Sequence, residues 1–132
     1  MRPLFATFVV ACALAIAGGT ARLGSLRAAL AIDRMMLKLL PSRADLIWLH
    51  MALLYDRTGK LIEALECLTT GRAVSVEPFM FELETARILE KTGDPTAAAS
   101  VYDRILKSYP ELDKSFRESV SAHLVDLHGA QS

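Results

Sequence analysis

Apolar residues recur at helical spacing along most of this 132-residue chain. No stretch alternates between apolar and polar residues for long enough to form a strand. Leucines three, four or seven positions apart mark one face of a helix over residues 24–40 that ends at Pro41. These leucines are Leu23, Leu26, Leu30, Leu37 and Leu40. The pattern predicts an all-α fold.

Residues with known capping preferences mark the ends of the helices that follow. Ser42, with Asp45 three residues on, resembles a capping box and predicts a helix that runs to residue 57 or 58. Gly59 then supplies the left-handed residue that ends it. Asp94 is the expected cap of a later helix, with Pro95 at its first position. Further helices are predicted over residues 61–74, 78–91, 95 to the break at Pro110, and 112–127.

The chain also matches itself at an offset of 34 residues. The segment Asp56-Arg57-Thr58-Gly59 recurs as Glu90-Lys91-Thr92-Gly93. The same offset superposes Ala52 on Ala86, Ala64 on Ala98, Leu46 on Met80, and Leu68 on Tyr102. Self-similarity at this period is typical of stacked helix-turn-helix arrays.

The first copy resembles a tetratricopeptide repeat (TPR), with the pattern Trp48-x-x-Met51-Ala52-x-x-Tyr55, then Gly59, Ala64-x-x-x-Leu68 and Pro78. In the second copy Glu82 replaces the Trp, Thr85 the Leu and Leu89 the Tyr, whereas Ala86, Gly93, Ala98, Tyr102 and Pro110 are kept. The resemblance covers residues 45–112. It implies a short helical solenoid in which the small alanines let paired helices approach closely. Trp48 and Tyr55 are expected to fill the gaps on either side.

Because two repeats rarely bury a continuous core, the flanking helices are expected to cap the stack. The predicted organisation has five parts. They are a hydrophobic anchor or signal segment (1–21), an N-terminal flanking helix (22–44), TPR-like repeat 1 (45–78), TPR-like repeat 2 (79–112), and a C-terminal capping helix with a tail (113–132).

The first residues are much more apolar than the rest. Residues 3–21 contain no charge and are close to the length of about 20 that a membrane-spanning helix needs. Arg22 and Arg27 follow directly and oppose translocation, which favours a retained single-pass anchor. A signal peptide cleaved after Ala17, leaving a secreted or periplasmic domain, and a mitochondrial presequence are the alternatives. The side of the membrane that the domain faces stays open.

Composition excludes several function classes. Fifteen basic residues balance fifteen acidic ones, so no basic surface predicts nucleic-acid binding. The chain has neither a Cys/His cluster nor a glycine-rich phosphate loop, which gives no support to a metal, a cofactor or a small-molecule substrate. Cys67 is expected to behave as a small half-buried apolar residue. We expect a binding protein and not an enzyme.

The TPR resemblance implies a concave groove lined by the first helix of each repeat. Its residues would be Leu46, Leu49, His50, Leu53, Asp56, Arg57, Met80, Leu83, Arg87, Glu90 and Lys91, with His50 at the edge. The Lys/Asn set that clamps a carboxylate in some relatives is absent, since Leu49 and Leu53 stand where it would begin. The groove is therefore expected to take an apolar peptide or helix of a protein partner. Alternatively, these leucines pack against the chain's own terminal helix.

Other polar groups are expected to be structural. A lone histidine such as His50 is more often structural than catalytic, and His123 and His128 are five residues apart, too far for a metal pair on one helix face. The glutamates at positions 63, 66, 82, 84 and 90 are expected on solvated faces. The sequence thus predicts a membrane-anchored TPR-like adaptor. A permanent single-pass subunit of a membrane complex is the alternative.

Overall fold

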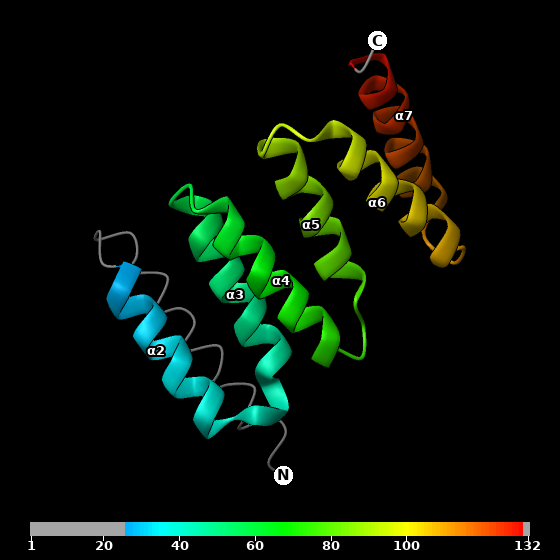
Figure 1. The fold of residues 1–132 in the computed structure, drawn as a ribbon. Helices are drawn as coiled ribbons and strands as arrows, with labels where there is room; N and C mark the ends of the chain where they lie inside the picture. The colour runs from blue at the N-terminus through cyan, green and yellow to red at the C-terminus, as the bar shows by residue number, and fades with distance from the viewer. Residues whose placement is uncertain (1–25, 131–132) are drawn as a thin grey trace. The chain divides into compact units, whose positions relative to one another are not determined.

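The structure is a computed structural model that describes residues 26–130. These residues form six α-helices and one 3-10 turn, with no strand (Figure 1). The elements are α2 (Leu26–Leu39), η1 (Pro41–Arg43), α3 (Ala44–Arg57), α4 (Leu61–Val74), α5 (Phe79–Lys91), α6 (Pro95–Ser108) and α7 (Lys114–Ala130). The all-α prediction is confirmed over this range. The predicted apolar segment 3–21 lies outside the described residues.

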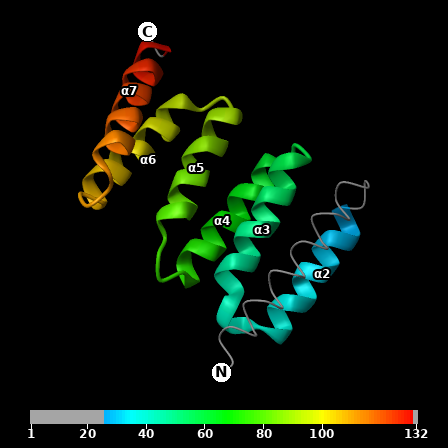
Figure 2. The same ribbon diagram turned by 180° about the vertical axis from the view of Figure 1, so that it is seen from behind.

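The chain divides into two compact units between Val76 and Glu77. In the first unit α3 packs along α4, and α2 packs against α3. In the second, α6 contacts both α5 and α7. These pairs lie side by side in both views of the ribbon (Figures 1 and 2). The predicted repeat boundaries within the chain stay predictions.

The turns between paired helices repeat at the predicted offset. Gly59 has a φ of +80° and Gly93 a φ of +83°, the left-handed conformation in which a Cβ atom is unfavourable. After Gly59, the amide of Lys60 donates to the carbonyl of Tyr55 at 2.9 Å. After Gly93, the amide of Asp94 donates to the carbonyl of Leu89 at 3.1 Å. Both glycines therefore end their helices in the same closed turn, as the sequence predicted.

Helix starts follow the predictions less evenly. The Oδ1 atom of Asp94 accepts from the amide of Ala97 at 3.0 Å with Pro95 in the first turn, so this cap is confirmed. The capping box at Ser42 is wrong. Pro41–Arg43 form the 3-10 turn, α3 starts only at Ala44, and no side chain caps it. The 3-10 turn thus occupies the positions at which the α-helix was predicted to begin.

The last helix also starts later than predicted, at Lys114. Asp113 supplies its cap, because Oδ2 accepts from the amides of Ser115 at 3.0 Å and Phe116 at 3.4 Å. A hydrogen bond from the Ser115 side chain, and then those from the amides of Phe116 and Ser115, lower the pKa of the Asp113 carboxyl below its ordinary value. The carboxylate thus satisfies amides that the first helical turn leaves without partners.

Small residues sit where the paired helices meet. Ala52 of α3 and Ala64 of α4 are fully buried, and so are their repeat mates Ala86 and Ala98 in α5 and α6. Larger apolar side chains complete each core. In the first unit these include Ile47, Leu54 and Leu68, and in the second Ile88 and Ile105. The predicted role of the alanines at the helix crossings is consistent with this burial.

The second unit adds an aromatic cluster to its core. The rings of Phe79 and Tyr109 pack edge to face, with their centroids 5.3 Å apart. Phe79 and Phe116 form a second edge-to-face pair, with centroids 5.7 Å apart. Val120, Leu124 and others on α7 are buried against α6. These contacts connect all three helices of this unit.

Candidate functional site

Three leucines of the predicted groove lie along one face of α3. Leu46, Leu49 and Leu53 are spaced by three and four residues, which places them on the same side of the helix. Leu46 is 37% exposed, and the other two are half-buried. We call these three residues the α3 surface. Near the end of α3, Asp56 is half-buried and Arg57 is exposed.

His50 does not belong to this surface. Its Nδ1 atom lies 2.8 Å from Oδ2 of Asp33 on α2, and only 13% of the histidine side chain is exposed. The other carboxylate oxygen of Asp33 is buried with no hydrogen-bond partner. His50 therefore holds α3 against α2, which is the structural role expected of a lone histidine.

The matching face of α5 is shorter and more polar. Met80 is 46% exposed, and Leu83 packs against the core of the second unit. We call these two residues the α5 surface. Arg87 pairs with Glu84 one turn earlier, with Nε 2.9 Å from Oε2, and Lys91 is exposed. The predicted residues thus lie in two separate sets, one in each unit, and a single groove that joins them stays a prediction.

Glu90, also predicted to face the groove, holds the second unit together. Its Oε2 atom accepts from the hydroxyl of Tyr102 on α6 at 2.7 Å. Its Oε1 atom lies 2.8 Å from Nε2 of His123 on α7. The rings of Tyr102 and His123 also meet edge to face at 5.2 Å. One carboxylate therefore links α5 to both other helices of the unit.

These contacts shift two pKa values. Burial raises the pKa of the Glu90 carboxyl. The hydrogen bonds from Tyr102 and His123 together lower it by more than burial raises it, so the pKa of Glu90 is below the ordinary 4.5. Burial, and then the hydrogen bond to Glu90, raise the pKa of the Tyr102 hydroxyl. The arrangement favours a charged carboxylate beside a neutral phenol, which suits a structural link.

Glu82 is the clearest departure from the expected solvated faces. It is 3% exposed, and its carboxylate accepts from Nε of Arg104 at 3.1 Å and from the hydroxyl of Tyr109 at 2.8 Å. The prediction of solvation was therefore wrong for this residue. A signal was present, because Glu82 stands where the TPR pattern has its tryptophan, a packed position.

Asp33 was missed for a related reason. It lies three residues after Leu30 and four before Leu37, so it falls on the leucine stripe of α2. The structure buries it completely. A charged residue on the apolar face of a helix needs a hydrogen-bond or ion-pair partner when it is buried, and its place on that face can be read from the sequence. The sequence does not reveal that this partner is His50.

A cavity of about 270 Å³ opens in the first unit. Trp48, Met51 and Tyr55 line it from α3. It is lined further by Arg34 of α2 and by Glu63, Glu66, Cys67 and Thr70 of α4. Trp48 and Tyr55 are half-buried and border this cavity, and their predicted filling of the gaps beside the alanines stays a prediction.

Cys67 lies at this cavity but is only 5% exposed, more buried than predicted. Burial is the main reason that its pKa is raised from 9.0 to about 11, and the charge of Glu66 is the next. A thiol with such a pKa is almost entirely protonated at neutral pH and is a poor nucleophile. Cys67 therefore has a packing role.

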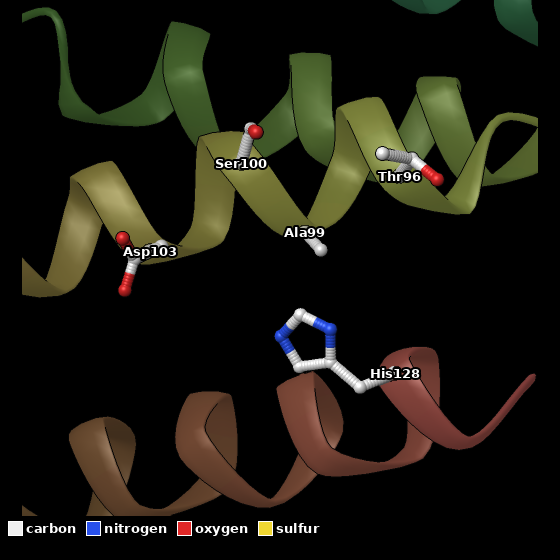
Figure 3. A pocket seen from close by; sticks show the side chains of 5 residues that line it. All are labelled: Thr96, Ala99, Ser100, Asp103 and His128. Atoms are coloured by element: carbon white, nitrogen blue, oxygen red, sulfur yellow. The ribbon is translucent and has the colours of Figure 1, made fainter. Parts of the chain in front are cut away.

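Another cavity, of about 300 Å³, lies between α6 and α7 (Figure 3). The imidazole of His128 faces Ala99, whereas the hydroxyl of Ser100 points to the opposite side (Figure 3). Asp103 lies one turn further along α6 and pairs with Lys107 at 2.8 Å. A serine, a histidine and an aspartate thus line one cavity, with the serine hydroxyl directed away from the imidazole. Among residues 26–130, no three His, Cys, Asp or Glu side chains gather to hold a metal.

No protein-family model and no curated protein matches the sequence. Solved structures do match the fold. The type III secretion translocator chaperone SycD of Yersinia enterocolitica is 16% identical, with a TM-score of 0.69 over 95% of this chain and 87% of that one. PcrH, solved with the chaperone-binding region of PopD, is 14% identical, with a TM-score of 0.72 over 96% of each chain.

A second SycD structure contains a peptide of the translocator YopD. It is 16% identical, with a TM-score of 0.69 over 94% of this chain and 95% of that one. At such identities the likeness shows the fold alone. The chain therefore has the all-helical, TPR-like fold of these translocator chaperones.

These findings correct the predicted function and location. The sequence predicted a membrane-anchored adaptor or a single-pass subunit of a membrane complex, and the apolar run at residues 3–21 alone carried that inference. That run lies outside the described residues. None of the helices between residues 26 and 130 has the length and apolar character that crossing a bilayer demands. Among the structures that share the fold, SycD is described as a type III secretion translocator chaperone, and PcrH and SycD were each solved with a partner segment bound.

Proposed function

We propose that this chain is a chaperone-like binding protein that holds a segment of a partner protein on the first helix of each hairpin. One observation carries the proposal. Leu46 and Met80 occupy the same position of the 34-residue repeat, and both expose a large apolar side chain, at 37% and 46%. Exposed apolar residues at repeat-related positions are typical of the binding faces of helical arrays.

The neighbouring side chains fit this role. Leu49 and Leu53 extend the α3 surface by two turns, and both are half-buried and within reach of a partner. Leu83 extends the α5 surface in the same direction along its helix. An apolar stripe of this kind suits alternate apolar side chains of an extended segment or one face of a helix. Binding, and no catalysis, is the role that we assign.

The fold likeness supports the same role without naming the partner. PcrH is described in complex with a region of PopD, and SycD with a peptide of YopD. We infer that this chain likewise binds a segment of another protein. The chemistry of its two surfaces indicates a segment with several aliphatic or aromatic residues.

Site-specific photo-crosslinking in cells that naturally express the protein tests this proposal. A photoreactive amino acid replaces Leu46 or Met80, and in the control it replaces Ile62, which is 62% exposed on α4 outside both surfaces. We expect the same partner protein to be captured at positions 46 and 80 and not at position 62. Capture only at 62, or equal capture at all three positions, would contradict the proposal.

A further inference from the structure

The cavity of the first unit combines aromatic walls with the carboxylates of two glutamates. Trp48 and Tyr55 are seven residues apart on α3, two turns along one face, with Met51 between them. Glu63 and Glu66 reach the cavity from α4. Neither carboxylate makes an ion pair with another residue of the described range.

The charge at this cavity is negative in balance. Arg34 is the one cation among the lining residues within the described range, against the two glutamates. Asp33 does not line the cavity, and one of its carboxylate oxygens contacts His50. Cys67 reports the resulting field. Burial is the largest cause of its raised pKa of about 11, and the charge of Glu66 is the second. Arg34 lowers this pKa, whereas Asp33 and Glu63 raise it by smaller amounts.

The dimensions suit one side chain better than a free ligand. The volume of about 270 Å³ lies just below the roughly 300–1,000 Å³ of small-molecule sites. The walls are apolar while the carboxylates come from one side, on α4. A long side chain with an apolar stem and a planar cationic head matches this distribution, because the head can stack on an indole or phenol and pair with a carboxylate.

We propose that this cavity is a second partner-binding site, which takes an arginine side chain of a partner protein. The stem lies against Met51 and the aromatic rings, and the guanidinium pairs with Glu63 and Glu66. The site is independent of the α3 surface. Residues two apart on a helix point to nearly opposite sides, and Trp48 and Tyr55 each lie two residues beyond a leucine of that surface.

The chain carries a built-in probe for this site, because Trp48 is its only tryptophan. The full chain is titrated with the peptide acetyl-Gly-Arg-Leu-Gly-amide while tryptophan fluorescence is recorded. The matched control peptide carries citrulline, a neutral isostere, in place of arginine. We expect a saturable change with the arginine peptide and at least tenfold weaker binding of the citrulline peptide. Equal binding of the two peptides would overturn the proposal.

Charge variants give results of opposite sign. The double variant E63Q/E66Q is expected to weaken binding of the arginine peptide about tenfold, whereas R34Q strengthens it about threefold by removing a competing cation. The control E111Q/E118Q removes the same charge from exposed positions of the second unit and leaves the affinity unchanged.

Circular dichroism verifies that each variant is helical. If E63Q/E66Q folds poorly, R34Q decides. Unchanged affinity in both E63Q/E66Q and R34Q, or tighter binding of a peptide with aspartate in place of arginine, would contradict the site. The variant Leu46→Asp serves as a further control. It alters the α3 surface but leaves the response of Trp48 to the arginine peptide intact, so the two proposals can fail separately.

Discussion

Trp48 in the first unit and Glu82 in the second occupy the same position of the 34-residue repeat, but their surroundings differ. Trp48 borders an open cavity beside carboxylates that make no ion pair with any residue between 26 and 130. Glu82 is buried and accepts hydrogen bonds from Arg104 and Tyr109. One repeat position therefore borders an open cavity in one unit and joins helices inside the core of the other.

The same contrast extends along both units. In the second unit Glu90 joins Glu82 in linking helices, and an aromatic cluster fills the space around Phe79. In the first unit a contact between His50 and Asp33 links α3 to α2. The turns and buried alanines are nonetheless alike. The repeat thus sets the backbone turns and the helix crossings. The polar residues that differ between the two copies decide in which unit buried side chains find hydrogen-bond partners within that unit.

The largest effect is expected from the cores, where the units should behave alike. Leu54 and Ile88 are repeat mates, and neither is exposed to solvent. Leu54→Ala and Ile88→Ala should each lower the free energy of unfolding by about 3 kcal/mol, because each removes buried methyl groups and leaves a cavity. Urea unfolding measures the loss, with the exposed Ile62→Ala as control. A cost below about 1 kcal/mol for either variant would show that the cores are not equivalent.

Removing the buried carboxylate of the second unit should have the next largest effect. Glu82→Ala leaves Arg104 and Tyr109 without their partner and is expected to cost about 2 kcal/mol, less than a fully buried ion pair because Arg104 is half exposed. The exposed Glu118→Ala should change stability by less than about 0.5 kcal/mol. Equal effects of the two variants in urea unfolding would mean that the network around Glu82 does not stabilise this unit.

The turn glycines should respond equally. Gly59→Ala and Gly93→Ala meet no atom within 4 Å of the added Cβ, so only the left-handed φ opposes them. Each should cost about 1 kcal/mol. Gly129→Ala, in α7 and also in open space, should be neutral or slightly stabilising. Thermal unfolding compares the three, and a cost at only one turn would break the equivalence of the repeats.

The smallest effect concerns pH. The pKa of Glu90 is lowered in the folded protein, so the stability that it contributes is present above its ordinary pKa of 4.5 and is lost as the pH falls through the lower, folded value. Glu90→Gln should therefore be less stable than the wild type by about 0.5–1 kcal/mol at pH 7, a modest value because the group is partly exposed. The difference should vanish in acid. If the wild type is still more stable than Glu90→Gln at pH 2, the lowered pKa of Glu90 is not the cause of the difference in stability.

Much of the backbone was predictable because local chemistry sets it. Gly59 and Gly93 mark turns that few other residues tolerate, and Asp94 with Pro95 marks a helix start. Helix α4 has the bounds that the apolar pattern predicted, Leu61–Val74. The start of α3 was missed because Ser42 lies inside a 3-10 turn and caps no helix.

The site was less predictable because it depends on partners distant in sequence. The position of Leu46 and Met80 followed from the repeat, but the pairing of Asp33 with His50, 17 residues later, did not. Glu90 was expected at a groove and instead links three helices. Residues at repeat positions can be placed from the sequence, whereas their polar partners need the packed structure.

The measurement that tests the central claim most directly is the affinity of the captured partner segment for matched variants. Isothermal titration calorimetry compares the wild type with Leu46→Asp/Met80→Asp and with Ile62→Asp, while circular dichroism verifies helicity. We expect the double variant to bind at least 100-fold more weakly, since two buried carboxylates replace apolar contacts. Ile62→Asp should bind as the wild type does. Equal affinity of all three proteins would contradict a partner-holding role for the α3 and α5 surfaces.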